Sequence, residues 1–157
     1  MKFHSPLVVV ENIERAKAFY ENVLGQKLLY DFGENIVFEG EFSLHLRTHF
    51  EKLTGAVCAP QGSGQDFELY FDEENFDELA AKIKGEPSVR LLHDVVEHPW
   101  GQRTIRFFDP DGHLIEVGEQ MESVVRRFFD QGLSPAEIVV RSQHPMEFVE
   151  KALAAHI

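Results

Sequence analysis

An internal repeat constrains the fold of this chain more than any other feature of its sequence. The apolar stretch Leu7–Val10, which is followed by acidic Glu11, returns as Glu68–Phe71 followed by Asp72. After each copy, the sequence pattern predicts one helix and then three strands. The repeat therefore predicts two βαβββ modules. Each module can curl its sheet, and two curled sheets can face each other around a cavity.

The first module is expected to begin with a strand over residues 3–10. A helix from Ile13 to about Leu24 follows, because apolar residues recur there at helical spacing. Asn12 is the predicted N-cap and Gly25 the predicted stop. Three further strands are expected, at Lys27–Phe32, Ile36–Glu39 and Phe42–Thr48.

The second module repeats this order after a predicted linker at Gln61–Gly64. The Asp109–Gly112 segment, Asp-Pro-Asp-Gly, is a strong turn signal between its last two strands. The predicted elements are a strand at Asp66–Phe71, a helix at Phe76–Ile83, and strands at Val89–Val96, Gln102–Phe108 and His113–Val117.

Beyond Gly118 the sequence becomes typical of helices. Helices are expected at Ser123–Gln131, Pro135–Arg141 and Pro145–Ala155. The predicted fold is α+β: two βαβββ modules forming a cupped mixed sheet over residues 1–120, with a helical C-terminal extension over residues 121–157. The extension superficially resembles a helix-turn-helix, but it lacks the basic face of a DNA reader. We expect it to pack on the domain or on a dimer partner.

The charge balance limits the partners of the chain. Its 157 residues carry 15 basic and 27 acidic side chains, a net charge of −12. This excess of acid argues against nucleic acid and against an anionic membrane, and it is compatible with a small-molecule ligand. No signal peptide or membrane span is recognised, so a cytoplasmic protein is expected. The single cysteine, Cys58, allows no internal disulfide.

Two motifs give the chain a resemblance to a known family. Asn12-Ile13-Glu14-Arg15-Ala16-Lys17-Ala18-Phe19-Tyr20, with Val23-Leu24-Gly25, resembles the first helix of the vicinal-oxygen-chelate superfamily. Arg106-Phe107-Phe108-Asp109-Pro110-Asp111-Gly112-His113, with Ile115-Glu116, resembles its last hairpin. This superfamily contains glyoxalases, bleomycin-resistance proteins and dioxygenases. The resemblance implies a paired βαβββ fold, often a homodimer, with a cupped sheet that can hold a divalent metal.

The resemblance also implies a set of metal positions. Metal-using members take one ligand from the first and fourth strands of each half, and these positions are Ser5, His45, Asp66 and Glu116 here. Ser5 departs from the family pattern. His4 could replace it if a bulge near Pro6 re-aimed the strand. One histidine with two carboxylates suits Zn, Ni, Mn or Fe. A metal-free polar cavity is the alternative.

Alternation along the strands predicts a polar face that lines the cavity. The arginines there could bind an anionic group of a substrate or could pair with neighbouring acids. Trp100 could cap the pocket mouth or anchor a dimer interface. The residues predicted to line this substrate pocket are Ser5, Arg47, Glu68, Tyr70, Trp100, Arg103 and Arg106.

Two functions follow from the resemblance. The first is a glyoxalase-I-like, metal-dependent lyase or isomerase acting on a small oxygen-chelating metabolite, with Glu116 as the catalytic base. The alternative is a non-enzymatic protein of the bleomycin-resistance type that binds an antibiotic or metabolite. An extradiol dioxygenase is disfavoured, because that chemistry prefers two histidines and one carboxylate. A thiol transferase of the fosfomycin type is disfavoured as well, because neither Ser5 nor Asp66 is histidine.

Overall fold

The structure, a computed structural model, describes residues 4–60 and 67–155. The chain forms two compact units. The first comprises the chain through Phe67 together with Glu86–Arg90 and Phe108–Leu114. The second comprises Glu68–Gly85, Leu91–Phe107 and the chain from Ile115 onward. Each unit contains one sheet, so each predicted module provides the sheet of one unit.

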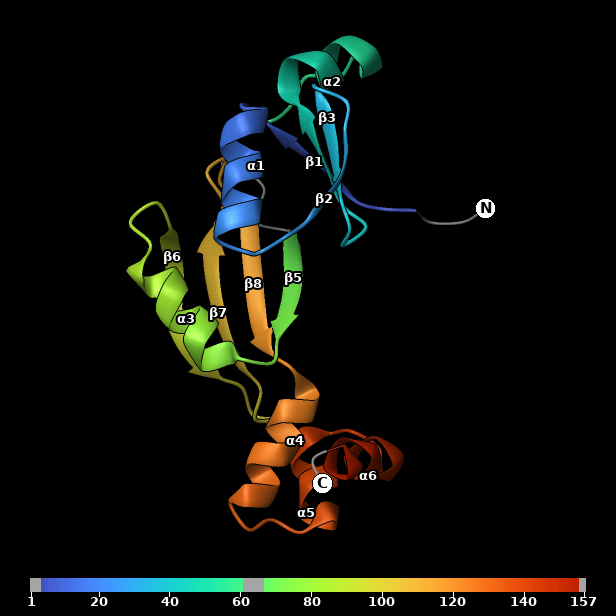
Figure 1. The fold of residues 1–157 in the computed structure, drawn as a ribbon, viewed down its shortest axis with the longest axis vertical. Coiled ribbons are helices and arrows are strands. Elements are labelled where there is room, and N and C mark those ends of the chain that lie inside the picture. Colours follow the sequence, from blue (N-terminus) through green and yellow to red (C-terminus); the bar gives the residue numbers. More distant parts are fainter. Residues whose placement is uncertain (1–3, 61–66, 156–157) are drawn as a thin grey trace. The chain divides into compact units, whose positions relative to one another are not determined.

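The first unit is a four-stranded sheet with α1 (Ile13–Asn22) on one face (Figure 1). The strands are β1 (Leu7–Val10), β2 (Leu28–Asp31), β3 (Asn35–Phe38) and β4 (Ser43–Leu46), in the order β1-β4-β3-β2. β1 pairs with β4 in parallel, whereas the other neighbours are antiparallel. The apolar side of α1 is buried with one face of the sheet, and this core includes Ala16, Phe19, Tyr20, Val10, Ile36, Phe38 and Leu44.

The turn at Asp109–Gly112 binds α1 within this first unit. The Tyr20 hydroxyl donates to Oδ2 of Asp109 at 3.1 Å, and Arg15 pairs with Asp111 at 2.8 Å. The predicted cap is also present, since the Asn12 side chain accepts a hydrogen bond from the backbone N–H of Arg15. The two motifs that carry the family resemblance are therefore in direct contact.

The prediction for the end of the first module was wrong in one respect. The strand expected to run to Thr48 ends at Leu46, and a helix, α2 (Arg47–Thr54), begins at once. The alternation of the strand continues to Leu46 and Arg47, but the apolar residues Phe50 and Leu53 then stand at helical spacing, and Gly55, at φ of +71°, provides the left-handed C-cap of a helix. The predicted linker and Asp66 lie outside the described residues.

The second unit repeats the topology of the first. Its strands are β5 (Glu68–Glu73), β6 (Arg90–Glu97), β7 (Arg103–Phe108) and β8 (Leu114–Glu119), in the order β5-β8-β7-β6. α3 (Phe76–Gly85) buries Phe76, Ala80 and Ile83. The predicted α+β fold with two βαβββ modules is confirmed, because both sheets have the order first, fourth, third and second strand.

Three helices follow β8, as the sequence predicts (Figure 1). They are α4 (Met121–Asp130), α5 (Pro135–Ser142) and α6 (Met146–Ala154), and they share a small core of Val124, Val125, Phe128, Ile138, Val149 and Ala152. Within the described part of the chain, no helix is both long enough and apolar enough to cross a membrane.

Candidate ligand-binding site

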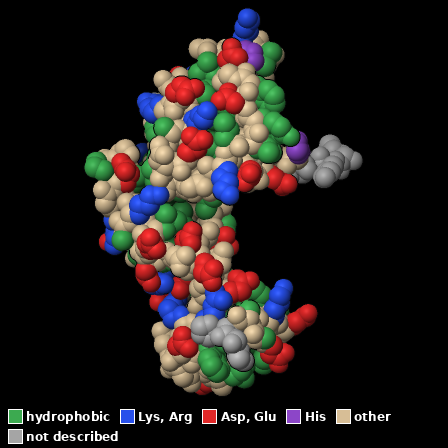
Figure 2. Space-filling model, viewed as in Figure 1, with side chains coloured by type: hydrophobic (Ala, Val, Ile, Leu, Met, Phe, Trp, Pro, Cys, Tyr) green, Lys and Arg blue, Asp and Glu red, His purple; other side chains and the backbone are tan. Residues whose placement is uncertain are grey.

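The face of the first sheet that α1 leaves uncovered carries a pocket of about 690 Å³. Alternation along β4 explains its orientation, because Leu44 is in the core whereas Ser43 and His45 line the pocket. The apolar lining consists of Leu7, Leu29, Tyr30, Phe32, Val37 and Phe38. The polar lining consists of His4, Ser5, Asn35, Glu41, Ser43 and His45. Figure 2 shows hydrophobic side chains grouped along an edge of the first unit.

Aromatic side chains form much of this pocket, and sequence reasoning missed them. Tyr30 is 55% exposed and Phe32 is 64% exposed, and their rings stack with centroids 5.8 Å apart. A shift in the pairing of β2 with β3, between Leu28 and Tyr30, leaves consecutive residues Leu29 and Tyr30 both exposed. Strict alternation predicts only one of the two on this face. The bulge is a tertiary feature that the sequence pattern does not reveal.

His4 and Ser5 both line the pocket. The sequence predicts that only one of the two can face the cavity, because neighbours in a strand point to opposite faces. β1 begins at Leu7, however, so these residues precede the strand. The alternation rule does not separate them there.

His45 is one of the two predicted metal ligands that line this pocket, and His4 is the other. The Nε2 of His45 lies 2.9 Å from Nδ1 of His49, which is on α2, and the His45 ring packs edge-on against Phe50. Burial lowers the pKa of His45, and the nearby His49 lowers it further. The imidazole is therefore neutral near pH 7 and can donate or accept a hydrogen bond according to its tautomer.

The second sheet also has one face that its helix leaves uncovered, and this face is polar. Arg106 lies between two carboxylates: it bonds to Glu68 at 3.1 Å and pairs with Glu116. Glu116 is only 6% exposed. The guanidinium neutralises the buried carboxylate of Glu116. The predicted catalytic base is therefore engaged in an ion pair. Glu68 and Arg106 were both predicted to line the pocket, and the structure brings them together.

Arg103 was predicted on this face, and the structure places it on the opposite one. Its guanidinium bonds to Glu119 and to Asp77 of α3, and it lies over the ring of Phe76. Burial alone would raise the pKa of Glu119, but the hydrogen bonds from Arg103 and Arg127 lower it overall. Arg103 is thus a structural link between β7 and α3. Strand alternation places Arg103 on the face opposite to Thr104 and Arg106.

Arg47 is likewise engaged elsewhere. It is the first residue of α2, where its guanidinium pairs with Glu11 and donates to the carbonyl of Ala59 at 2.9 Å. It does not line the pocket of the first sheet. The predicted strand would have placed its side chain beside that of His45, but the helix that begins there redirects it.

Trp100 belongs to the turn between β6 and β7. Its indole stacks on His98 with centroids 4.5 Å apart, and Nε1 donates to Gln102 at 3.2 Å. The Gln102 amide in turn donates to the Tyr70 hydroxyl at 3.0 Å. His98 and Gln102 were not predicted as site residues. Their signal was weak, since a turn with a histidine and a glutamine has no distinctive spacing.

Neither unit by itself groups the predicted metal ligands, because His45 lies in the first unit and Glu116 in the second. Over residues 4–60 and 67–155, no three His, Cys, Asp or Glu side chains lie close enough together to hold a divalent metal ion. Arg106 competes with any cation for Glu116, and Ser5 provides a hydroxyl where metal-using relatives have a stronger ligand. Asp66 lies outside the described residues. Divalent metals are common in glyoxalase-like proteins, but this donor set departs from that pattern.

Comparison with known proteins identifies relatives of this fold. The family model described as "Glyoxalase-like domain" matches residues 3–122. A protein of unknown function from Agrobacterium tumefaciens is 39% identical, with a TM-score of 0.69, over 76% of this chain and 94% of that one. A glyoxalase/bleomycin resistance protein/dioxygenase from Nocardioides is 21% identical, with a TM-score of 0.59, over 76% and 83%.

A lactoylglutathione lyase from Agrobacterium tumefaciens is 19% identical, with a TM-score of 0.59, over 77% of this chain and 96% of the lyase. At such identity the likeness shows a shared fold and carries no activity with it. The match of the family model over residues 3–122 confirms the resemblance found in the sequence. This chain belongs to the glyoxalase-like domain family of the vicinal-oxygen-chelate superfamily.

Proposed function

We propose that this protein binds a small aromatic molecule in the pocket on the first sheet. The observation that carries the proposal is the stacked, exposed pair of Tyr30 and Phe32 beside a pocket of about 690 Å³. Ligand pockets are typically apolar clefts of this size with a few polar groups that fix orientation. Ser43, His45 and Asn35 supply such groups here.

The charges near the site favour a neutral or cationic ligand. The pocket lining includes Glu41 and, within the described part of the chain, neither lysine nor arginine. The three arginines that the sequence suggested for an anion are paired with acids: Arg47 with Glu11, Arg103 with Glu119 and Arg106 with Glu116. An aromatic cation gains from the rings and from the acidic surroundings together.

Calorimetric titration with proflavine, a planar aromatic cation, tests the proposal. The variant Phe32→Ala is expected to weaken binding about five-fold, which corresponds to the loss of one stacked ring. Phe32 is exposed, so its replacement should leave stability unchanged. Leu53→Ala is the matched control, because Leu53 is equally exposed at 64% but lies on α2 outside the pocket lining. Equal affinities in Phe32→Ala and wild type would contradict the proposal.

The metal-dependent lyase is the competing function. Two observations favour it: His45 lines the pocket and Glu116 is a buried carboxylate on an uncovered sheet face. Metal analysis of the purified protein decides between the two. Stoichiometric Zn, Ni, Mn or Fe that is lost in both His45→Ala and Glu116→Ala would establish the lyase as the working hypothesis. Absence of metal after incubation with each ion would leave the binding function.

Assembly and location remain predictions. We expect a homodimer, as the family resemblance implies, and light scattering of the purified protein measures this directly. A cytoplasmic location is expected from the sequence, and cell fractionation tests it.

A further inference from the structure

The hairpin between β3 and β4 places a glutamate in a backbone conformation that favours glycine. Its loop consists of Glu39, Gly40 and Glu41. The N–H of Phe38 donates to the Phe42 carbonyl at 3.0 Å, and the N–H of Glu41 donates to the Phe38 carbonyl at 3.2 Å. Hairpin loops of three residues typically end with a left-handed residue, most often glycine. Here that position is occupied by Glu41, at φ of +60°, and the glycine stands one position earlier.

The conformation of Glu41 is strained, and no contact of its side chain compensates for the strain. In the described part of the chain, Gln143 is the other non-glycine residue with positive φ, and it is the C-cap of α5, where this conformation is common. Glu41 caps no helix. In the left-handed region a glutamate Cβ crowds the backbone, and such strain tends to be retained where a side chain has a function. The side chain of Glu41 therefore calls for a functional explanation.

That side chain lines the pocket on the first sheet. Of the described residues in the lining, Glu41 is the only Asp, Glu, Lys or Arg. Over residues 4–60 and 67–155, its carboxylate makes neither an ion pair nor a hydrogen bond. A bound cation can supply the missing counter-charge, and an ammonium group can also donate hydrogen bonds to the carboxylate.

The carboxylate and the aromatic pair lie toward different ends of β3. Tyr30 pairs with Val37 inside the strand, and the N–H of Phe32 donates to the carbonyl of Asn35, the first residue of β3. Glu41 instead belongs to the turn that follows the other end of the strand. The strand extends about 10 Å, at roughly 3.3 Å per residue. A ligand that reaches both features therefore needs an elongated apolar body with positive charge at one end.

We propose that Glu41 determines the ligand class of this pocket by binding the cationic nitrogen of a protonated aromatic amine, while Tyr30 and Phe32 stack on its ring. The inference rests on the proposed binding function. It adds the residue that recognises the ligand and the chemical group that is recognised. Three observations carry it: the strained backbone of Glu41, its place in the lining, and its unpaired carboxylate.

Two dyes and three variants test this role. Proflavine is a cation with an amino group at each end of its three-ring plane, whereas acridine has the same rings without amino groups and is uncharged at pH 7.5. Fluorescence titration of both dyes is performed on wild type, Glu41→Gln and Glu41→Gly. Glu39→Gln is the matched control, because it removes the same charge from the same turn and Glu39 does not line the pocket. An ionic strength of about 0.15 M limits the general field of the protein to about 8 Å.

In Glu41→Gln, the ratio of proflavine affinity to acridine affinity is expected to fall about three-fold, as for the loss of one exposed charge pair. Glu39→Gln should keep the ratio of wild type. Glu41→Gly should lose the same selectivity. Its Tm should lie about 2 °C above that of Glu41→Gln, because both variants lack the charge and only glycine relieves the strain. Thermal melts of the two variants measure this difference.

The outcomes separate this inference from the proposed function. Suppose that Phe32→Ala weakens proflavine binding, but the dye ratio is unchanged in Glu41→Gln or falls equally in Glu39→Gln. The role of Glu41 is then overturned and the proposed function stands. If wild type binds neither dye, the proposed function fails, and this inference fails with it. A Tm of Glu41→Gly no higher than that of Glu41→Gln would overturn the strain.

Discussion

Asp109 shows at the residue scale how one buried carboxylate organises its surroundings. It is 4% exposed, and it accepts hydrogen bonds from the Tyr20 hydroxyl and from Nδ1 of His113, the latter at 2.8 Å. Burial by itself lowers the pKa of His113, but the hydrogen bond and the negative charge of Asp109 outweigh burial and raise it overall. The protonated imidazole is therefore stabilised by folding.

Stability should consequently fall as pH rises past the ordinary range of histidine. A raised pKa in the folded state means that the contribution of His113 is complete below its ordinary value of 6.5 and is lost as pH rises through the higher, folded-state pKa. The variant His113→Gln should show a smaller decrease in Tm over that range than wild type. Thermal melts at closely spaced pH values measure this, and parallel curves for the two proteins would contradict it.

Two glycines with similar backbone angles allow the cost of backbone strain to be measured apart from the cost of steric overlap. Gly101 and Gly55 both have positive φ, at +89° and +71°, but only Gly101 has a ring against its Cα, whereas a Cβ at Gly55 would meet nothing within 4 Å. We expect Gly55→Ala to cost about 1 kcal/mol of unfolding free energy, from backbone strain alone. Gly101→Ala should cost at least about 2 kcal/mol more, because Phe128 must move as well. Urea unfolding of both variants gives the comparison, and equal losses would show that Phe128 adapts freely.

At the element scale, local sequence signals and tertiary context compete, and the outcome differs from element to element. α5 follows its local signals: Ser134 caps it, Pro135 begins it, and Glu137 completes a capping box. The start of α2 has no such signal, because its N-cap residue Leu46 makes no side-chain hydrogen bond and the alternation of the preceding strand runs directly into Arg47. β2 departs from strict alternation at a bulge, which adds Leu29 to the exposed face that carries Tyr30.

The cap of α5 can be tested by itself. Ser134→Ala should reduce the unfolding free energy by about 1 kcal/mol, because the backbone N–H of Glu137 loses its acceptor. Ser134→Asp is the matched control, since aspartate also accepts from the N-terminal N–H groups of a helix. Chemical denaturation followed by circular dichroism measures both. A loss of the same size in the aspartate variant would point to packing at this position instead of capping.

At the scale of the whole molecule, net charge influences what the pocket can bind. The chain carries a net charge of −12, and acidic side chains are spread over the visible surface (Figure 2). Such a field attracts cations and repels anions, and added salt screens it.

The field predicts opposite salt effects on two aromatic probes. Binding of proflavine should weaken by about two- to five-fold when ionic strength is raised from about 0.02 to 0.2 M. Binding of the anion anilinonaphthalene sulfonate, which is weaker at low salt, should strengthen over the same range. Fluorescence titrations of the wild-type protein measure both. Identical salt dependence for the two probes would show that charge does not contribute to ligand choice.

Much of the fold could be predicted because the features that determine it are periodic and local. Strand and helix periods, caps and glycine stops depend on neighbours within a few residues, and a repeated pattern must give a repeated topology. The two βαβββ modules, the three C-terminal helices and the family follow from these signals. The sequence also determined that His45 shares a sheet face with Ser43, because strand alternation leaves no other choice.

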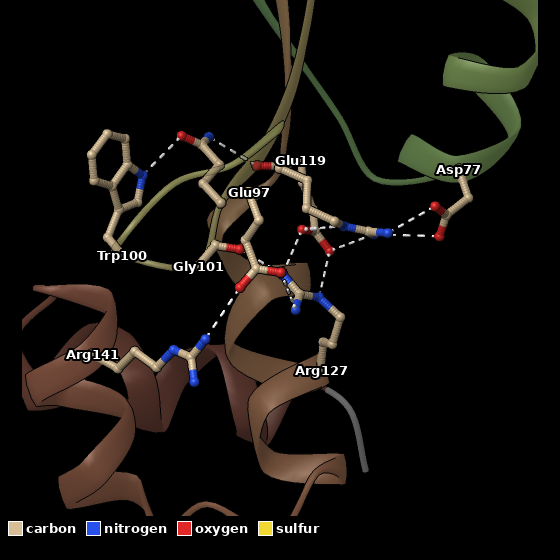
Figure 3. A network of polar contacts seen from close by, with 9 residues as sticks. Asp77, Glu97, Trp100, Gly101, Glu119, Arg127 and Arg141 are labelled. Atoms are coloured by element: carbon tan, nitrogen blue, oxygen red, sulfur yellow. Dashed lines mark hydrogen bonds and ion pairs between the residues drawn. The ribbon is translucent and has the colours of Figure 1, made fainter. Parts of the chain in front are cut away.

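Only the tertiary structure decided which charged residues are available to a ligand. Glu116 and Arg106 are both polar residues on an uncovered face, but their pairing depends on two strands, β8 and β7, coming side by side. Arg103 is committed to Asp77 and Glu119 for the same reason. The contacts of α4 and α5 with the turn between β6 and β7 likewise join residues that are distant in sequence (Figure 3). The sequence encodes these contacts, but no local pattern reveals them, since each depends on where the whole chain places its partner.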